Sequence, residues 1–166
     1  MMSAVFTACS SSDDDNGGGT PPPPAPRAGI VNLDGTEKPI VKAEYEDGGN
    51  GNYYLYLLTD SKEIVRIDFN KGLHMTGSPI SLTKKEEKHT GFYWLVKYYK
   101  SDSSNLIGAY GEPGSSEPSF KTGTLTASGS PESTINIKLE NGCVKGTDGK
   151  EYTLTISYSG PMTEKK

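Results

Sequence analysis

Apolar and polar residues alternate through much of the second half of this chain, and this period of two limits the fold more than any other feature. Successive side chains of a β-strand point to opposite faces, so alternation predicts a strand with one buried face. The pattern is clearest in residues 135–139, where Ile135, Ile137 and Leu139 share one side. Residues 152–158 repeat it with two tyrosines, a leucine and an isoleucine. We therefore expect a chain built almost entirely of strands.

Similar runs continue toward the N-terminal side, separated by turn residues. The expected strands are 41–45, 53–58, 63–69, 79–83, 92–99, 106–110, 121–128, 135–139 and 152–158. About eight to ten strands at this spacing are typical of all-β folds. We expect an antiparallel meander that forms a β-sandwich or a flattened, lipocalin-like β-barrel. A helical turn is conceivable only near residues 84–88.

Two dipeptides in the C-terminal third are strong hairpin signals. Asn141-Gly142 and Asp148-Gly149 both suit a two-residue turn that needs positive φ at its central positions. A further turn is expected at residues 47–51, where Gly48-Gly49-Asn50-Gly51 follows an aspartate. These turns predict antiparallel neighbours along the chain.

The N-terminal stretch predicts export and a lipid anchor. Phe6-Thr7-Ala8-Cys9 resembles a lipobox, in which small residues lead to a cysteine that can be acylated. We expect residues 1–8 to be a residual signal peptide whose true start lies upstream, because its apolar region is short. Residues 9–27 form a lipidated cysteine and an acidic, Gly- and Pro-rich disordered tether. Residues 28–166 then form a single all-β domain.

A family resemblance follows from the residues after Cys9. The run Ser10 to Asn16, which contains three aspartates, resembles the start of surface lipoproteins of Bacteroides-type bacteria. The end of the chain, ending Tyr158-Ser159-Gly160-Pro161, is similar to the last hairpins of uncharacterised lipoproteins of that group. The resemblance implies a surface-exposed, lipid-anchored outer-membrane protein. It carries no known activity.

The second cysteine, Cys143, is expected to be a small hydrophobe on or beside a strand. A disulfide with Cys9 is the alternative, but a flexible leader is a poor partner for a fixed strand, and a lipid on Cys9 would exclude it. The formal net charge of -4 with no basic block argues against nucleic acid as a partner. No apolar run approaches the ~20 residues of a spanning helix, so membrane contact is expected only through the lipid.

The sequence contains few catalytic patterns, and those present do not have a setting that supports catalysis. Ser81 and Lys84 match S-x-x-K, and Lys121-Thr122-Gly123 matches K-T-G, as in penicillin-interacting serine enzymes. A strand sends residues three apart to opposite faces, so Ser81 and Lys84 cannot work together. His74, His89 and the Glu86-Glu87 pair have no spacing that indicates a metal site or an acid–base pair. We expect no enzyme activity, cofactor or metal.

Aromatic residues are the remaining signal. They gather in residues 53–56 and 93–99, where core and cross-strand packing is the plainer interpretation. The functional alternative is a platform that stacks on sugar rings, with Tyr93 and Tyr99 flanking Lys97 and with Trp94 beside them. The expected function is thus a non-catalytic binding module for a glycan or an envelope protein. The alternatives are a lipocalin-like carrier of a small apolar ligand and a structural subunit of a surface complex.

Overall fold

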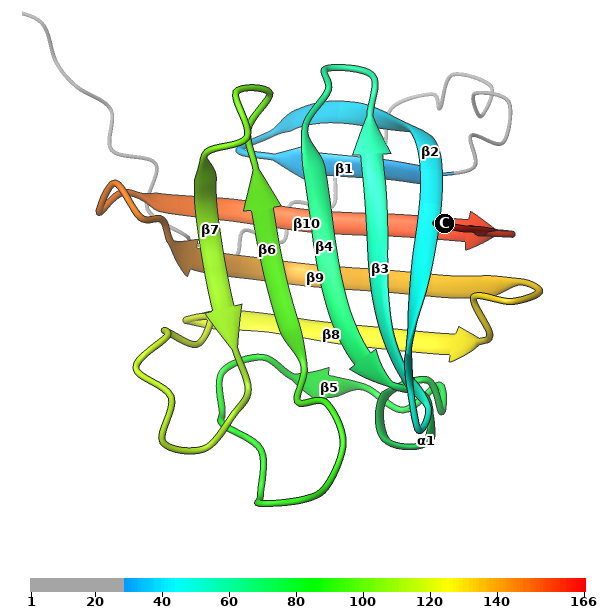
Figure 1. Cartoon of the computed structure of the whole chain (residues 1–166). Coiled ribbons are helices and arrows are strands. Elements are labelled where there is room, and N and C mark those ends of the chain that lie inside the picture. Colours follow the sequence, from blue (N-terminus) through cyan, green and yellow to red (C-terminus); the bar gives the residue numbers. More distant parts are fainter. Residues whose placement is uncertain (1–28) are drawn as a thin grey trace, which may run out of the picture.

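The computed structural model describes residues 29–166, and these form one curled sheet (Figure 1). The strands are β1 Gly29–Leu33, β2 Thr36–Gly49, β3 Asn52–Thr59, β4 Ile64–Asn70, β5 Ile80–Ser81, β6 Leu95–Tyr99, β7 Asn105–Tyr110, β8 Thr122–Gly129, β9 Ile135–Lys145, β10 Glu151–Gly160 and β11 Thr163–Glu164. The one helix among them is α1, Lys71–His74. The order across the sheet is β5-β8-β9-β10-β1-β2-β3-β4-β6-β7, with β11 beside β2. Apart from the parallel β11–β2 pair, neighbours are antiparallel, so the predicted all-β class is confirmed.

Two layers cross each other steeply in this half-barrel (Figure 1). The front layer contains β3, β4, β6, β7 and most of β2, and the rear layer contains β1, β10, β9, β8 and β5. Strand β2 belongs to both, because its start pairs with β1 and its remainder with β3. The register shifts between Ile40 and Lys42, and such a bulge bends a strand. Val41, at that bulge, points to solvent with 60% of its surface exposed.

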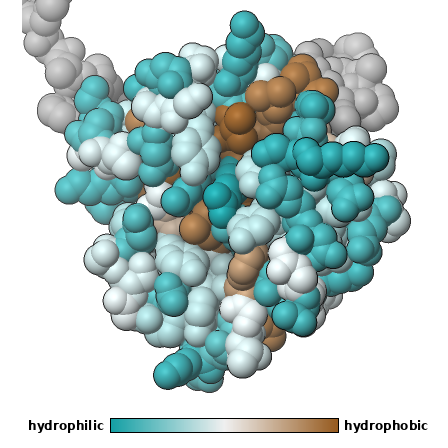
Figure 2. All heavy atoms as spheres, in the orientation of Figure 1, coloured by the Kyte–Doolittle hydropathy of each residue, from teal (hydrophilic) through white to brown (hydrophobic). Residues whose placement is uncertain are grey.

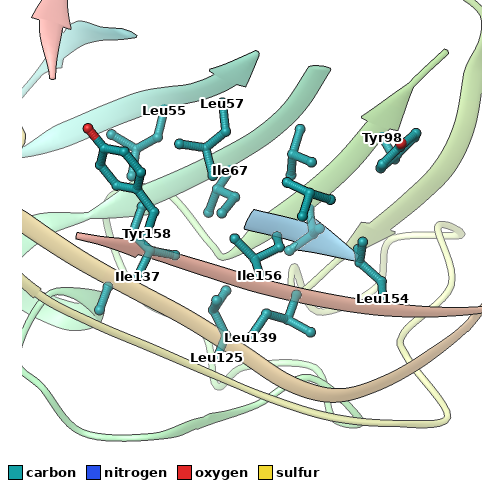
Figure 3. Packing of buried hydrophobic residues seen from close by; sticks show 14 of the residues in the cluster. Leu55, Leu57, Ile67, Tyr98, Leu125, Ile137, Leu139, Leu154, Ile156 and Tyr158 are labelled. Atoms are coloured by element: carbon teal, nitrogen blue, oxygen red, sulfur yellow. The ribbon is translucent and has the colours of Figure 1, made fainter. Parts of the chain in front are cut away.

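The space between the layers is filled by side chains. Figure 3 shows Leu55, Leu57 and Ile67 of the front layer facing Leu139 and Ile156 of the rear layer. Each of these five is at most 2% exposed. The inward positions of residues 63–69, 135–139 and 152–158 are those that alternation predicted. The interior is therefore a packed core of the kind that two crossed sheets form.

Other segments cover both ends of the sheet path. At one end, β8 pairs along its outer edge with the short β5. The same edge makes further backbone hydrogen bonds, among them one from the Gly77 N–H to the Ala127 carbonyl at 2.8 Å. The free edge of β7 is bonded at Tyr110, whose N–H donates to Pro118, and at Leu106, whose carbonyl accepts from Thr147. Open edges invite pairing with another chain. Much of both edges is already occupied here.

Several sequence expectations were wrong in detail. Asn141-Gly142 lies inside β9 and not in a hairpin turn, although Asn141 does have positive φ, at 53°. Its place is a bulge, where two residues of β9 face one of β10. Asp148 and Gly149 do lie in the turn between β9 and β10. Strand β1 was not predicted, and the short helix is α1 rather than residues 84–88.

The expected signal peptide, the lipidated Cys9 and the tether lie outside the described residues. Cys143 is buried in β9 with 2% exposed, as expected. It forms a disulfide, however, so the interpretation of Cys143 as an unpaired small hydrophobe was wrong. Its pairing with Cys9 also lies outside the described residues. Within residues 29–166, no helix has the length and apolar character needed to cross a membrane.

Candidate functional site

The outward side of the front layer carries a regular array of tyrosines and charges, which we call the outer face. It consists of Tyr54, Tyr56, Leu58, Ile64, Arg66, Asp68, Lys97 and Tyr99. The strand registers align it in rows, because Tyr56 is opposite Arg66 and Arg66 is opposite Lys97, while Ile64 lies between Leu58 and Tyr99. Figure 2 shows this side as a mosaic of hydrophilic and near-neutral residues with smaller hydrophobic areas.

Most charges of the outer face are already paired. Arg66 donates two hydrogen bonds to Asp68, each 2.7 Å long, and its guanidinium lies 4.8 Å from the centre of the Tyr54 ring. The carboxylate raises the pKa of Arg66 above its ordinary value through these bonds. Lys165 lies 4.4 Å from the centre of the Tyr56 ring and pairs with Glu46. The rings of Tyr54 and Tyr56 are therefore occupied by contacts within the protein.

Lys97 and Tyr99 differ from these neighbours. Both are partly exposed on β6, two residues apart and on the same side of the sheet. Within residues 29–166 neither side chain makes a hydrogen bond, an ion pair or a ring contact. Lys97 interacts electrostatically with Asp68, and Tyr99 with Arg66. An ammonium group and a phenol hydroxyl are thus left for an external acceptor.

The other two predicted site residues lie elsewhere. Tyr93 precedes β6, and its hydroxyl donates to the His89 carbonyl at 3.0 Å while its ring lies 4.1 Å from the His89 ring. Trp94 is fully buried and belongs to the core, as the packing interpretation expected. The structure brings Lys97 and Tyr99 together and leaves Tyr93 and Trp94 off the outer face. The reason is that β6 begins at Leu95, so strand alternation does not extend back to residue 92.

A second cluster joins His74, Glu86 and His89, and no sequence pattern indicated it. We call it the His–Glu–His cluster. Nε2 of His74, on α1, lies 2.7 Å from Oε1 of Glu86, and Nε2 of His89 lies 3.6 Å from the same oxygen. Oε2 of Glu86 accepts the Trp94 N–H at 2.8 Å. The Glu86 carboxylate therefore links α1 to two points of the loop 82–94, at His89 and Trp94.

Hydrogen bonds fix the tautomers of both histidines. The Asn70 N–H donates to Nδ1 of His74 at 2.8 Å, so the proton of this ring is on Nε2 and is donated to Glu86. Nδ1 of His89 lies 2.9 Å from the Thr90 carbonyl, which can only accept, so Nδ1 carries the proton. Nε2 of His89 is left with a lone pair. That atom is buried and has no hydrogen-bond partner.

The pKa of Glu86 reflects this setting. Burial alone would raise it, but the bonds from His74 and from the Trp94 N–H outweigh burial and lower the pKa below its ordinary value. Glu86 is therefore ionised at neutral pH. Glu87, next in sequence, is exposed, so the two carboxylates diverge as a loop predicts.

The ligand atoms of the cluster all lie within 4.8 Å of one another, a spacing that a metal ion could bridge. The tautomer of His74 opposes this. Its Nδ1 already accepts a backbone N–H, whereas a histidine that binds a metal ordinarily donates from its second nitrogen. His74 could bind a metal only as an imidazolate or after losing the Asn70 bond. The three side chains therefore form a hydrogen-bonded cluster and not a preformed metal site with three ligands.

Ser81, the first residue of the S-x-x-K match, lies on β5, and its hydroxyl is 2.9 Å from that of Thr83. The match therefore has the strand setting that we expected. An open groove of about 380 Å³ lies on the rear layer across β1, β2, β9 and β10. Its lining combines polar side chains such as Asn32, Glu37 and Thr155 with the apolar Ile30, Leu139 and Ile156.

Comparison of the chain with protein-family models, curated proteins and solved structures finds no match.

Proposed function

We propose that this chain is a lipid-anchored protein of the bacterial cell surface, and that its β domain is a non-catalytic module that binds a glycan on the outer face. The observation that carries the proposal is the pair Lys97 and Tyr99. They are partly exposed donors on a rigid sheet, and within residues 29–166 their side chains make no hydrogen bond or ion pair. Neighbouring charges on the same face are already paired.

The chemistry of these two side chains suits a sugar. Tyrosine offers an apolar ring together with a polar hydroxyl, and a sugar ring has both C–H surfaces and hydroxyl groups. Lys97 adds up to three donors. The paired Arg66 beside Lys97 is held by Asp68, so this part of the face is ordered before binding, which reduces the entropy lost on association.

The anchor is proposed from the N-terminal residues. Cys9 follows a lipobox-like Thr7-Ala8 and precedes the acidic run, which resembles the export signal of Bacteroides-type surface lipoproteins. Acyl chains contribute ~0.8 kcal/mol per buried CH₂, so two or more chains hold a protein durably on a membrane. The Gly- and Pro-rich residues that follow would space the domain from the bilayer.

An envelope protein is the second candidate ligand, because tyrosine and arginine are enriched where proteins bind each other. The partly exposed Leu58 and Ile64, in the same row as Tyr99, favour it. The carrier alternative finds less support, since large side chains fill the interior. Assembly through sheet edges is opposed by the bonds that already cover them.

Binding of the full chain to a panel of immobilised neutral and acidic polysaccharides tests the glycan proposal. Lys97→Gln and Tyr99→Ala should each weaken binding about tenfold, the effect of losing one good polar or stacking contact of about 1.4 kcal/mol. Lys100→Gln is the matched control, because Lys100 is exposed just past the end of β6. Unchanged affinity in both test variants would refute the role of the outer face.

Mass spectrometry of the protein isolated from its own envelope tests the anchor. Acyl chains on Cys9 support it, and Cys9→Ser should move the protein from the membrane to the soluble fraction. A non-reducing measurement that finds Cys9 joined to Cys143 would contradict the anchor, because one sulfur cannot carry both bonds.

A further inference from the structure

Lys97 faces another cation on the outer face. The register of β4 and β6 places it directly opposite Arg66, and both side chains are only partly exposed. Like charges that face each other across two strands are unfavourable. The sheet therefore keeps an ammonium group at a position where the neighbouring strand offers repulsion and not a partner.

The carboxylates around this position are engaged by other cations. Asp68 accepts one hydrogen bond on each of its oxygens from Arg66. The other two belong to ion pairs of 2.7 and 3.0 Å on β2, Glu44–Lys42 and Glu46–Lys165. Lys97 interacts electrostatically with Asp68, but within residues 29–166 it forms no ion pair with it.

One more carboxylate borders Lys97, on the side of β7. Gly108 is the residue of β7 opposite Lys97, and Oε2 of Glu117 lies 3.4 Å from the position that a Cβ would take on Gly108. Glu117 lies in the exposed loop after β7 and makes no ion pair with Lys97 among the described residues. A carboxylate placed in this way would compete with an anionic ligand, and its removal should therefore strengthen binding of such a ligand.

The local charge is opposite in sign to that of the whole chain. At the centre of the outer face, Arg66 and Lys97 are cations and Asp68 is the anion between them, which leaves an excess of one positive charge. The chain as a whole has a formal net charge of -4. A positive spot on an acidic protein selects for anions and against other acidic surfaces of the same protein.

We propose that the ligand of the outer face is an acidic glycan, in which Lys97 binds the carboxylate or sulfate group of one sugar while Tyr99 contacts the ring of its neighbour. This inference rests on the proposed function, because it names the class of glycan that the same site binds. Residues two apart on a strand lie ~6.6–6.8 Å apart, so both side chains can contact adjacent sugars. A charge-assisted hydrogen bond is about twice as strong as a neutral one, and a neutral glycan would leave the excess charge uncompensated.

Two matched pairs of polymers test the charge of the ligand on the full chain. Polygalacturonate is compared with the same polymer after reduction of its carboxyl groups, and dextran sulfate is compared with dextran, so that carboxylate and sulfate are distinguished. The wild type should bind one of the charged polymers about tenfold more tightly than its uncharged counterpart. About 1 M NaCl, at which the screening length is ~3 Å, should remove most of this preference.

Variants of the same chain locate the preference. Lys97→Gln should abolish it and Lys97→Arg should retain it, whereas the matched Lys100→Gln should leave it unchanged, because Lys100 is exposed just past the end of β6. Glu117→Gln should strengthen binding of the charged polymer about twofold to threefold. A preference that survives Lys97→Gln would overturn the proposal, because another cation would then be responsible.

Other outcomes separate this inference from the proposed function. Equal binding of charged and uncharged polymers, weakened in both cases by Tyr99→Ala, would overturn the acidic ligand and leave the glycan proposal standing. Binding of poly-L-glutamate as tight as that of the charged polysaccharides would overturn it in favour of an acidic protein. Absence of binding to every polymer would refute both the inference and the proposed function.

Urea unfolding gives a readout that does not depend on the ligand. Because Lys97 faces Arg66 and makes no ion pair within residues 29–166, Lys97→Gln should leave the folding constant unchanged or raise it up to about threefold. A variant that binds acidic polymers more weakly and yet is at least as stable supports a lysine kept for its ligand. A tenfold fall in the folding constant would mean that Lys97 holds the sheet together, and would contradict the proposal.

Discussion

The contact between Gly111 and Trp94 offers a sharp test of how tightly the core is packed. A Cβ placed on Gly111 would lie 2.4 Å from Nε1 of Trp94 and 2.6 Å from its Cδ1. Gly111 has no left-handed backbone conformation, so alanine meets no torsional obstacle there. The substitution Gly111→Ala therefore tests almost only whether the core has room for one more methyl group.

The magnitude follows from the geometry. Ordinary contacts are ~3.5–4.0 Å, so the indole or the Gly111 segment must move by about 1 Å. Trp94 is fully buried in a close-packed interior, where overpacking typically costs ~1–3 kcal/mol. Alanine recovers ~0.4–1 kcal/mol by restricting the unfolded chain. The difference of these two terms predicts that Gly111→Ala destabilises the fold by about 1–2 kcal/mol and lowers Tm by about 3–7 °C.

Thermal and urea unfolding followed by tryptophan fluorescence measure this directly, because Trp94 is the only tryptophan. Gly108→Ala is the matched control. A Cβ at Gly108 would meet only the side-chain ends of Asn105 and Glu117, at 3.2 and 3.4 Å. We expect a change within ~0.5 kcal/mol for this variant. Equal stability of Gly111→Ala and Gly108→Ala would refute the packing of Trp94 described above.

Three further predictions concern other parts of the domain. Burial would raise the pKa of Glu63, but bonds from Lys38 and from the Tyr98 hydroxyl lower it, so Glu63 stabilises the fold above its unfolded value of ~4.3 and this stability is lost as pH falls through the folded pKa. Glu63→Gln should therefore be less stable at pH 7 and lose less stability on acidification to pH 3, as measured by urea unfolding at each pH. Burial and a bond to Glu132 raise the pKa of Tyr53 to about 12, so Tyr53→Phe should remove a late-titrating tyrosine from the absorbance titration at alkaline pH. Val41→Lys, at the exposed bulge of β2, should change stability by less than ~0.5 kcal/mol in the same urea assay, and a larger loss would mean that Val41 is buried.

The alternating strands could be predicted from sequence because one of their faces is buried. In β9, the apolar residues Ile135, Ile137 and Leu139 are buried in the core, while Asn136 and Lys138 are exposed. The alternation of apolar and polar residues therefore indicates which face of the strand is buried. Strand β1 was missed because its residues, Gly29–Leu33, follow a proline-rich stretch and form only one short strand. Asn141-Gly142 misled for a different reason: positive φ is needed at a bulge as well as at a turn.

The candidate site was only partly readable from sequence. Strand alternation correctly predicted that Lys97 and Tyr99 lie on the same face of the sheet. It could not reveal that Tyr93 lies in a loop and not in a strand. The His–Glu–His cluster lies beyond such reasoning, because α1 and the loop 82–94 bring its members together through tertiary packing. A His and a Glu three residues apart, as in Glu86 and His89, are too common to indicate a site.

Because the interior is filled, side chains that point inward should contribute mainly to stability, whereas side chains on the outer face remain available for binding. Leu57 is fully buried and faces the rear layer, so Leu57→Ala should cost ~2–5 kcal/mol of stability. Tyr99→Ala, on the outer face, should cost less than about 1 kcal/mol while it weakens glycan binding. A carrier would behave in the opposite way, because its inward residues would contact the ligand and their truncation would enlarge the cavity. An apolar fluorescent probe distinguishes the two cases. A packed core predicts weak probe binding to the wild type and tighter binding to Leu57→Ala, because the substitution opens a cavity. Strong probe binding to the wild type would mean that the interior is not filled.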